Sequence, residues 1–313
     1  MEALLLAAIF LEKKGEIKPS RLAETFELHY APERAARTRA VAELGARVQA
    51  VLTNGTTGLD AAEMAAMPAL KLVSALGAGY ENIALDAAHA RGITVTNGSG
   101  TNADCVADHA FALLLACVRD LVQFDAACRR GVWRDHLPMR PNVSGKRLGI
   151  VGLGTIGEKI ARRAAGFDMT IGYHNRQARA HSTHTYFDNV TALAQWSDYL
   201  VIATPGGAQT RHLIDRAVLD ALGPQGFLVN ISRGSVVDTA ALAQALREQR
   251  IAGAGLDVYE GEPQAPQDLL DLPNVVLTPH VGGTSPQAQE AALQLFIDNA
   301  ARYFAGDPVL MQL

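Results

Sequence analysis

The chain has 313 residues, of which 49% are hydrophobic and 19% are charged, a composition typical of globular proteins. Its net charge of −4 gives no electrostatic reason to expect a nucleic-acid partner or an anionic membrane surface. The longest apolar runs, residues 4–11 and 110–118, are too short to span a bilayer, and no signal-peptide pattern opens the chain. Its three cysteines, without a CxxC motif, are typical of reduced thiols. We therefore expect a cytoplasmic protein, and the length favours two domains.

The first hundred residues alternate apolar segments with helical patterns, which predicts a parallel sheet covered by helices on both faces. Strands are expected at residues 4–10, 26–30, 48–53, 71–76 and 93–96, and helices at 18–25, 32–44, 60–67 and 86–91. The loop after the fourth strand contains Ala78 and Gly79, at the end of a strand where open α/β sheets bind ligands. Small residues there leave N–H groups available to an anion, although a plain connecting turn explains the spacing equally well.

An apolar helical pattern then covers residues 102–130 and predicts one helix long enough to link two domains. An irregular stretch with Trp133, Pro138 and Pro141 follows it.

The motif Gly-Leu-Gly-Thr-Ile-Gly at residues 152–157 follows a short apolar strand and precedes a helical pattern that starts near Glu158. Gly152 permits the tight turn, Gly154 lets a pyrophosphate approach the backbone, and Gly157 lets the helix pack closely on the strand. The N–H groups at the start of the helix then hold the phosphates. An ordinary glycine-rich turn is the alternative, but the strand before the motif and the helix after it favour a dinucleotide site.

The next strand, expected at residues 169–173, ends where an NAD site usually carries an acidic residue that binds the ribose 2′-hydroxyl. Asn175 and Arg176 stand there instead, with Arg179 nearby. Because a guanidinium pairs well with phosphate oxygens, the pattern favours NADP(H) over NAD(H), which remains possible. A solvated basic loop would leave this preference open.

Further strands are expected at residues 199–204, 227–232, 255–259 and 275–278, with a helix at 239–250. Arg233, Glu262 and His280 fall just past the ends of three of these strands, at the edge where ligands bind. Next to a nicotinamide, such a set suggests hydride transfer to a carbonyl. His280 can donate a proton, and Glu262 can hold the imidazole and raise its pKa. Arg233 can bind a substrate carboxylate and polarise the adjacent carbonyl.

Taken singly, each of these residues has a simpler interpretation. Arg233 could form a surface ion pair, Glu262 could be an exposed turn residue, and His280 could be a polar residue before a helix. His181 and His184 lie three residues apart without a second pair of ligands, so we expect them at the surface and expect no metal site.

Together, these motifs resemble the D-isomer-specific 2-hydroxyacid dehydrogenase family, and within it the glyoxylate/hydroxypyruvate reductase branch. The resemblance rests on the glycine motif, on Val-Asn-Ile-Ser-Arg-Gly-Ser-Val-Val-Asp at 229–238, and on Gly-Leu-Asp-Val-Tyr-Glu-Gly-Glu-Pro at 255–263. Leu-Thr-Pro-His-Val-Gly-Gly at 277–283 and the segments 78–83 and 106–109 also fit. The first seventy residues match only in general pattern.

The resemblance implies a role for each matching position. Arg233, Glu262 and His280 fall on the catalytic arginine, glutamate and histidine of the family. Ala78 and Gly79 fall on the family's loop that binds the substrate carboxylate, and Thr155 and Ile156 fall on positions that contact the pyrophosphate. Thr204 and Pro205 fall on positions that border the adenosine. The Ile231 carbonyl and Asp257 fall on the groups that hold the nicotinamide carboxamide. His109, inside the long helix, is expected to have a structural role.

The resemblance also implies the fold. It predicts an α/β protein of two domains, with a Rossmann doubly wound parallel sheet inserted into a flavodoxin-like substrate domain. Residues 1–98 and 286–313, with a returning helix at 286–304, would form the substrate-binding domain, and residues 99–285 the NAD(P)-binding domain. The family is usually dimeric, and the long helix with the Trp133 region would supply much of the contact.

The expected reaction is NADPH-dependent reduction of small 2-oxoacids, glyoxylate and hydroxypyruvate, to D-2-hydroxyacids, with His280 as general acid. One alternative is a reductase of a bulkier 2-ketoacid such as a 2-ketoaldonate. Another is a non-catalytic nucleotide-sensing protein on the same fold, because a fold does not fix a function.

Overall fold

The computed structural model describes residues 6–10, 22–31 and 33–313. The chain divides into two compact units, residues 1–102 with 283–313 (unit 1) and residues 103–282 (unit 2). The first half of the helix expected at residues 18–25 lies outside the described residues. In the described part of the chain, no helix is long and apolar enough to cross a membrane.

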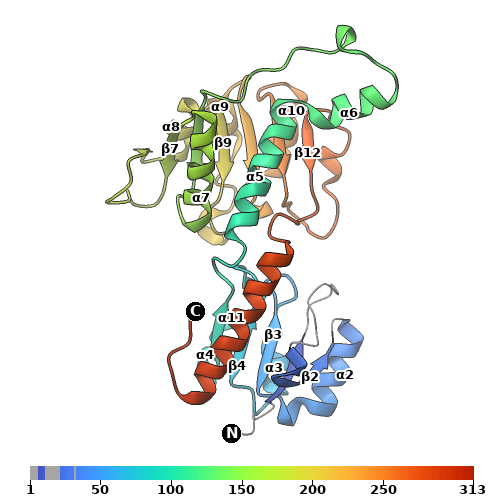
Figure 1. Ribbon diagram of the computed structural model, residues 1–313, viewed down its shortest axis with the longest axis vertical. Helices are drawn as coiled ribbons and strands as arrows, with labels where there is room; N and C mark the ends of the chain where they lie inside the picture. Colours follow the sequence, from blue (N-terminus) through green and yellow to red (C-terminus); the bar gives the residue numbers. More distant parts are fainter. Residues whose placement is uncertain (1–5, 11–21, 32) are drawn as a thin grey trace. The chain divides into compact units, whose positions relative to one another are not determined.

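Unit 1 is a five-stranded sheet in the order β2-β1-β3-β4-β5, with parallel neighbours throughout, which is the flavodoxin-like order (Figure 1). Its strands are β1 (Leu6–Phe10), β2 (Phe26–Tyr30), β3 (Ala50–Thr53), β4 (Leu72–Ala75) and β5 (Thr94–Asn97). The helices of its described residues are α2 (Arg34–Leu44), α3 (Ala61–Ala65), α4 (Leu85–Ala90) and α11 (Pro286–Ala305). β3, β4 and most of β5 are buried, as expected of a sheet covered on both faces.

The long helix α11 covers one face of this sheet, and α2, α3 and α4 contribute to the core on the other. Phe296 of α11 stacks on Phe26 with ring centroids 5.1 Å apart. The C-terminal residues then cover the edge of β5, because Leu313 N donates to Val95 O at 2.9 Å. Asn299, fully buried on α11, fixes this segment by bonding both backbone groups of Leu310. The end of the chain therefore closes an otherwise open sheet edge.

Unit 2 is a seven-stranded parallel sheet in the order β12-β11-β10-β9-β6-β7-β8. The order reverses between β6 and β9, which makes the doubly wound arrangement of a Rossmann fold. Its strands are β6 (Arg147–Val151), β7 (Thr170–His174), β8 (Thr185–Tyr186), β9 (Tyr199–Ile202), β10 (Phe227–Asn230), β11 (Gly253–Leu256) and β12 (Val275–Leu277).

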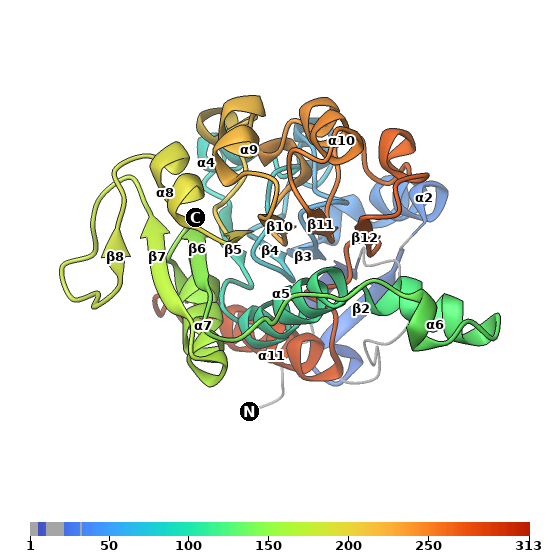
Figure 2. The same cartoon turned by 90° about the horizontal axis from the view of Figure 1, so that it is seen from above.

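Helices cover both faces of this second sheet (Figure 2). α5 (Ala103–Val118) and α7 (Thr155–Ala164) pack on one face. α8 (Val190–Trp196), α9 (Arg216–Leu222) and α10 (Thr239–Arg247) pack on the other. The α/β fold class expected from the sequence is confirmed, whereas β8, α8 and α9 had no counterpart among the expected elements.

The prediction of a single helix over residues 102–130 is wrong. α5 ends at Val118, and a separate helix, α6, covers Leu121–Arg129. Asp120 between them has a left-handed backbone with φ of 56°, and its carboxylate accepts a hydrogen bond from Arg140 Nε at 3.0 Å. The chain turns here without glycine or proline, so the apolar pattern runs through the break unchanged. α7 likewise begins at Thr155 rather than near Glu158.

Candidate active site

The glycine turn after β6 has the geometry that a pyrophosphate needs. A Cβ at Gly152, whose φ is 102°, would lie 2.7 Å from Thr204 N, so this turn tolerates only glycine. A Cβ at Gly157 would lie 2.3 Å from Gly152 O, because α7 packs tightly on β6. Around Gly154, in contrast, the space is open. Thr155 and Ile156 form the first turn of α7, whose N–H groups lack helical acceptors. These features fit a dinucleotide phosphate group.

The loop after β9 borders this turn, because Thr204 N lies close to Gly152. Pro205 O accepts a hydrogen bond from Thr210 Oγ1 at 2.9 Å, which folds the loop back on itself. Thr204 and Pro205 therefore lie beside the glycine turn.

The residues after β7 support the same turn. Asn175 Oδ1 accepts from Leu153 N at 2.7 Å, and Asn175 Nδ2 donates to Leu153 O at 3.4 Å. Arg179 also donates to Leu153 O, and its guanidinium lies 3.8 Å from the Glu158 carboxylate. The side chain of Asn175 is thus directed at the backbone of the turn, while Arg176 is exposed.

A hollow of about 250 Å³ lies beside this loop. It is lined by Glu158, Arg179, Ala180, His181 and Ser182. His181, which the sequence analysis placed at the surface, is exposed and forms part of its wall. Within the described residues, no group of three or more His, Cys, Asp or Glu side chains could hold a metal ion.

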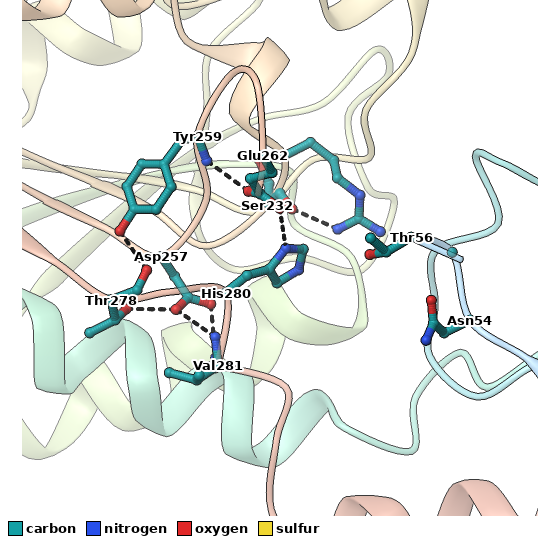
Figure 3. Close-up of polar contacts among 12 residues, drawn as sticks. Asn54, Thr56, Ser232, Asp257, Tyr259, Glu262, Thr278, His280 and Val281 are labelled. Carbon is teal, nitrogen blue, oxygen red and sulfur yellow. Dashed lines mark hydrogen bonds and ion pairs between the residues drawn. The ribbon is translucent and has the colours of Figure 1, made fainter. Parts of the chain in front are cut away.

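His280 and Glu262 are brought together by the loops after β12 and β11 (Figure 3). His280 Nδ1 and Glu262 Oε2 are 2.7 Å apart, and Glu262 Oε1 accepts from Tyr259 N at 2.8 Å. The His280 side chain remains 40% exposed, which leaves the ring accessible. Because Glu262 engages Nδ1, Nε2 is the ring nitrogen left to carry a transferable proton.

The pair shifts both pKa values in the direction that favours an imidazolium. The hydrogen bond that His280 donates to Glu262 raises the pKa of His280, against the opposing effects of partial burial and the Arg233 charge. Burial tends to raise the pKa of Glu262, but the hydrogen bonds from His280 and Tyr259 N outweigh it, so that pKa is lowered. A protonated histidine beside an ionised glutamate can act as a general acid.

Asp257 fixes the segment that carries His280. It is 2% exposed, and its carboxylate accepts from Thr278 Oγ1 at 2.6 Å, Val281 N at 2.9 Å and Gly282 N at 2.8 Å. Its backbone carbonyl accepts from His280 N at 2.8 Å. Burial would raise the pKa of Asp257, but hydrogen bonds from His109, Thr278 and the two backbone amides lower it to about 2.

His109 extends this network from α5. Its Nε2 lies 2.8 Å from Thr278 Oγ1 and 3.3 Å from Asp257 Oδ1. The sequence motifs predict no role for Thr278 and only a structural role for His109. The signal available for Thr278 was its place two residues before His280, within the same motif.

Arg233 follows β10 and is held by a second buried network. Asn230, 1% exposed, accepts from Ser232 N at 3.0 Å and donates from Nδ2 to Arg233 O at 3.1 Å. Arg233 Nη1 donates to Ser232 O at 2.7 Å. A Cβ at Gly206 would lie 2.8 Å from Arg233 Cγ, so the loop after β9 passes directly against the arginine stem. Ile231, next in the chain after β10, is buried.

In unit 1, the loop with Ala78 and Gly79 follows β4. Asn97 Nδ2 donates to Ala78 O at 2.9 Å, and Asn82 Nδ2 donates to the carbonyls of Gly55 and Thr56 at 3.0 Å. These bonds fix the loop against its neighbours within the unit.

Residues 111–282 match the family model described as D-isomer specific 2-hydroxyacid dehydrogenase, NAD binding domain. The chain belongs to the D-isomer specific 2-hydroxyacid dehydrogenase family. Family membership makes it an NAD(P)-dependent oxidoreductase, with 2-hydroxyacids and the matching 2-oxoacids as its substrate class.

Its relatives carry several substrate names. It is 42% identical to hydroxyphenylpyruvate reductase of Plectranthus scutellarioides, over 84% of each chain. It is also 42% identical to 2-ketogluconate reductase of Gluconobacter oxydans, over 84% of this chain and 85% of the other. Among solved structures, the NADPH-dependent glyoxylate/hydroxypyruvate reductase of Sinorhizobium meliloti, in complex with NADP and malonate, is 38% identical with a TM-score of 0.88. That match covers 98% of this chain and 96% of the other.

Proposed function

We propose that this enzyme reduces small 2-oxoacids, with glyoxylate and hydroxypyruvate as favoured substrates, to D-2-hydroxyacids, and that it prefers NADPH. The observation that carries the proposal is the His280–Glu262 pair, 2.7 Å apart, with the histidine pKa raised. The loops that hold it follow parallel strands of the same sheet as the glycine turn, so they meet at one edge.

In this mechanism Arg233 binds the substrate carboxylate and polarises the neighbouring carbonyl. We assign the Ala78–Gly79 loop as a second carboxylate ligand, through its backbone N–H groups. The Ile231 carbonyl and Asp257 would hold the carboxamide of a bound nicotinamide, whose chemistry would be the supply of a hydride to the carbonyl carbon. His280 donates its Nε2 proton to the carbonyl oxygen, which becomes the hydroxyl, and Glu262 stabilises the imidazolium beforehand. The neutral imidazole then regains a proton from solvent.

Removal of the Arg233 guanidinium tests this assignment. We expect Arg233→Ala to lower kcat/KM for glyoxylate and hydroxypyruvate by about a hundredfold or more, as for loss of a charged transition-state contact. Arg247→Ala is the matched control, because Arg247 is an exposed residue at the end of α10 that donates a hydrogen bond to Asp268 O. A folded Arg233→Ala enzyme with near-normal turnover would contradict the proposal. The same assay over a panel of 2-oxoacids identifies the substrate.

A bulkier 2-ketoacid is the second candidate, supported by the 42% identity to the 2-ketogluconate reductase of Gluconobacter oxydans. A higher kcat/KM for a 2-ketoaldonate than for hydroxypyruvate would favour it. No oxidation of either cofactor with any 2-oxoacid would favour a nucleotide sensor instead.

The NADPH preference is supported by the basic loop after β7. No carboxylate stands at residues 173–176, Arg176 is exposed, and Arg179 lines the neighbouring hollow. The relative from Sinorhizobium meliloti is named NADPH-dependent. We assign Arg176 as the 2′-phosphate ligand and Asn175 as the residue that braces the turn beneath it.

Two arginine variants separate these roles. Arg176→Ala should raise KM for NADPH about tenfold and leave KM for NADH nearly unchanged, because only NADPH carries the 2′-phosphate. Arg179→Ala should weaken the binding of both cofactors, because Arg179 also donates a hydrogen bond to Leu153 O in the glycine turn. Arg162→Ala, an exposed position on α7, is the control. Equal effects of Arg176→Ala on the two cofactors would refute the assignment.

We also propose that the enzyme is a homodimer. Four of the ten exposed large hydrophobic side chains in the described part of the chain lie within residues 121–139. They are Leu121, Val122, Trp133 and Met139. Such a concentration is typical of an interaction surface.

A further inference from the structure

The loop between β9 and α9 makes contacts that the proposed mechanism does not use. His212 lies in this loop with a left-handed φ of 50°. Its N–H donates to Ser235 O at 2.8 Å, and two residues later Ile214 N donates to Val236 O at 3.0 Å. The His212 segment is therefore bonded along the segment that follows Arg233.

The side chain of His212 reaches a third loop. Its Nε2 lies 2.8 Å from Glu260 Oε1, in the loop that carries Glu262. The other oxygen, Glu260 Oε2, accepts from Thr239 N at 3.2 Å, at the start of α10. Arg211 lies 3.8 Å from Glu260 Oε1, and Asp238 Oδ2 lies 3.9 Å from His212 Nδ1. One carboxylate thus joins three segments of unit 2.

Glu260 also lies where the two site loops touch. A Cβ at Gly234, the residue after Arg233, would lie 1.9 Å from the Tyr259 carbonyl carbon and 2.4 Å from Glu260 N. The N–H of Tyr259 donates to Glu262, which holds His280. A displacement of Glu260 would therefore move the Tyr259 amide, and with it the carboxylate that orients the general acid.

We propose that His212 and Glu260 are positioning residues, which lock the loop of Glu262 against the loop of Arg233. The inference rests on the roles proposed above for Arg233, Glu262 and His280. The side chains of His212 and Glu260 are 35% and 28% exposed, so their bond lies at the margin of the core. Its loss should cost little stability, because contacts between partly exposed polar side chains are screened by solvent. Loss of the contact should lower kcat more strongly, because catalysis is sensitive to small misplacements of the reacting groups.

Three substitutions test the pair. Glu260→Gln removes the charge of the carboxylate. His212→Asn makes the side chain too short to reach Glu260, and asparagine still tolerates the left-handed backbone at this position. His212→Gln keeps a hydrogen-bond donor at nearly the length of the imidazole, so this variant should retain much of the activity that His212→Asn loses. Glu248→Gln is the matched control, since Glu248 is a surface carboxylate of unit 2 that pairs with Arg250.

We expect Glu260→Gln and His212→Asn each to lower kcat about tenfold per NADPH-binding site, with KM for NADPH unchanged. The basic limb of the kcat–pH profile should move to lower pH, because a looser Glu262 supports the imidazolium less. The double variant should be little worse than either single one, as for two halves of one interaction. Titration with NADPH counts correctly folded sites, so partial unfolding does not imitate the effect.

Two outcomes overturn the inference. One is a kcat and pH profile of Glu260→Gln equal to those of Glu248→Gln. The other is additive losses in the double variant. His280→Ala, measured alongside, separates this failure from failure of the proposed function. If His280→Ala is inactive while Glu260→Gln is normal, only the positioning role is wrong, whereas an active His280→Ala enzyme refutes the mechanism itself.

Discussion

At the scale of single residues, two carboxylates in one loop do different work because their surroundings differ. Asp257 is buried and accepts bonds from Thr278, Val281 and Gly282, so its pKa falls to about 2 and its charge is permanent. Glu262 faces the half-exposed His280 and raises the pKa of that histidine. The first carboxylate fixes the backbone, and the second tunes the proton donor.

The charge of Glu262 therefore predicts a pH effect. Reduction needs protonated His280, so its rate falls as the pH rises through the His280 pKa. Glu262→Gln keeps an acceptor for Nδ1 but removes the charge that raises this pKa. We expect the basic limb of kcat for 2-oxoacid reduction to move to lower pH, because the pKa of His280 falls when the Glu262 charge is removed. Steady-state rates between pH 5 and 10 measure it, with Glu248→Gln as control; an unmoved limb would show that the charge does not set this pKa.

Residue types were predictable at this scale, whereas most side-chain partners were not. The strand-end rule places Arg233, Glu262 and His280 at the edge of one sheet from sequence alone. It does not say that Asn175 bonds the backbone of Leu153, or that His212 reaches Glu260. Those pairs depend on loop conformations, which periodicity does not encode.

At the scale of elements, every strand except β8 was predictable to within about three residues, because buried parallel strands are continuous apolar runs. The α5–α6 break was not predictable, since Asp120 adopts a left-handed backbone without glycine. The glycine turn shows why its motif was informative. Gly152 and Gly157 are required by close backbone contacts, whereas Gly154 borders open space.

This difference predicts that alanine at Gly157 impairs stability, whereas alanine at Gly154 impairs cofactor binding. Gly157→Ala should lower the free energy of unfolding by about 1–3 kcal/mol, because its Cβ would meet Gly152 O. Gly154→Ala should leave the free energy of unfolding nearly unchanged, yet weaken the binding of both NADPH and NADH, because the added methyl group blocks the approach of the pyrophosphate. Denaturant unfolding and cofactor titration measure the two effects. A Gly154→Ala enzyme with normal cofactor affinity would mean that the phosphates do not pass this residue.

At the scale of the whole molecule, the chain leaves unit 1 after Asn102 and returns after Gly282, so unit 2 is an insertion. Each unit closes its own sheet with its own helices and forms separate cores. The strand orders explain how one chain carries two such sheets, because each follows a common doubly wound order. α6 and the stretch after it, in contrast, project from the edge of unit 2 in both views (Figures 1 and 2).

That projection gives the prediction for assembly. Trp133 is 67% exposed and Met139 is 98% exposed, on a segment that lies away from the core of unit 2. Leu121 and Val122 of α6 are about half exposed, so a charge at either would be costly inside an apolar contact. We expect the native enzyme to sediment with twice the chain mass and Val122→Glu to sediment as a monomer at micromolar concentration. Leu270→Glu, at an equally exposed leucine elsewhere in unit 2, should remain dimeric. If Val122→Glu stays dimeric, or if the native chain is a monomer, residues 121–139 do not form the contact.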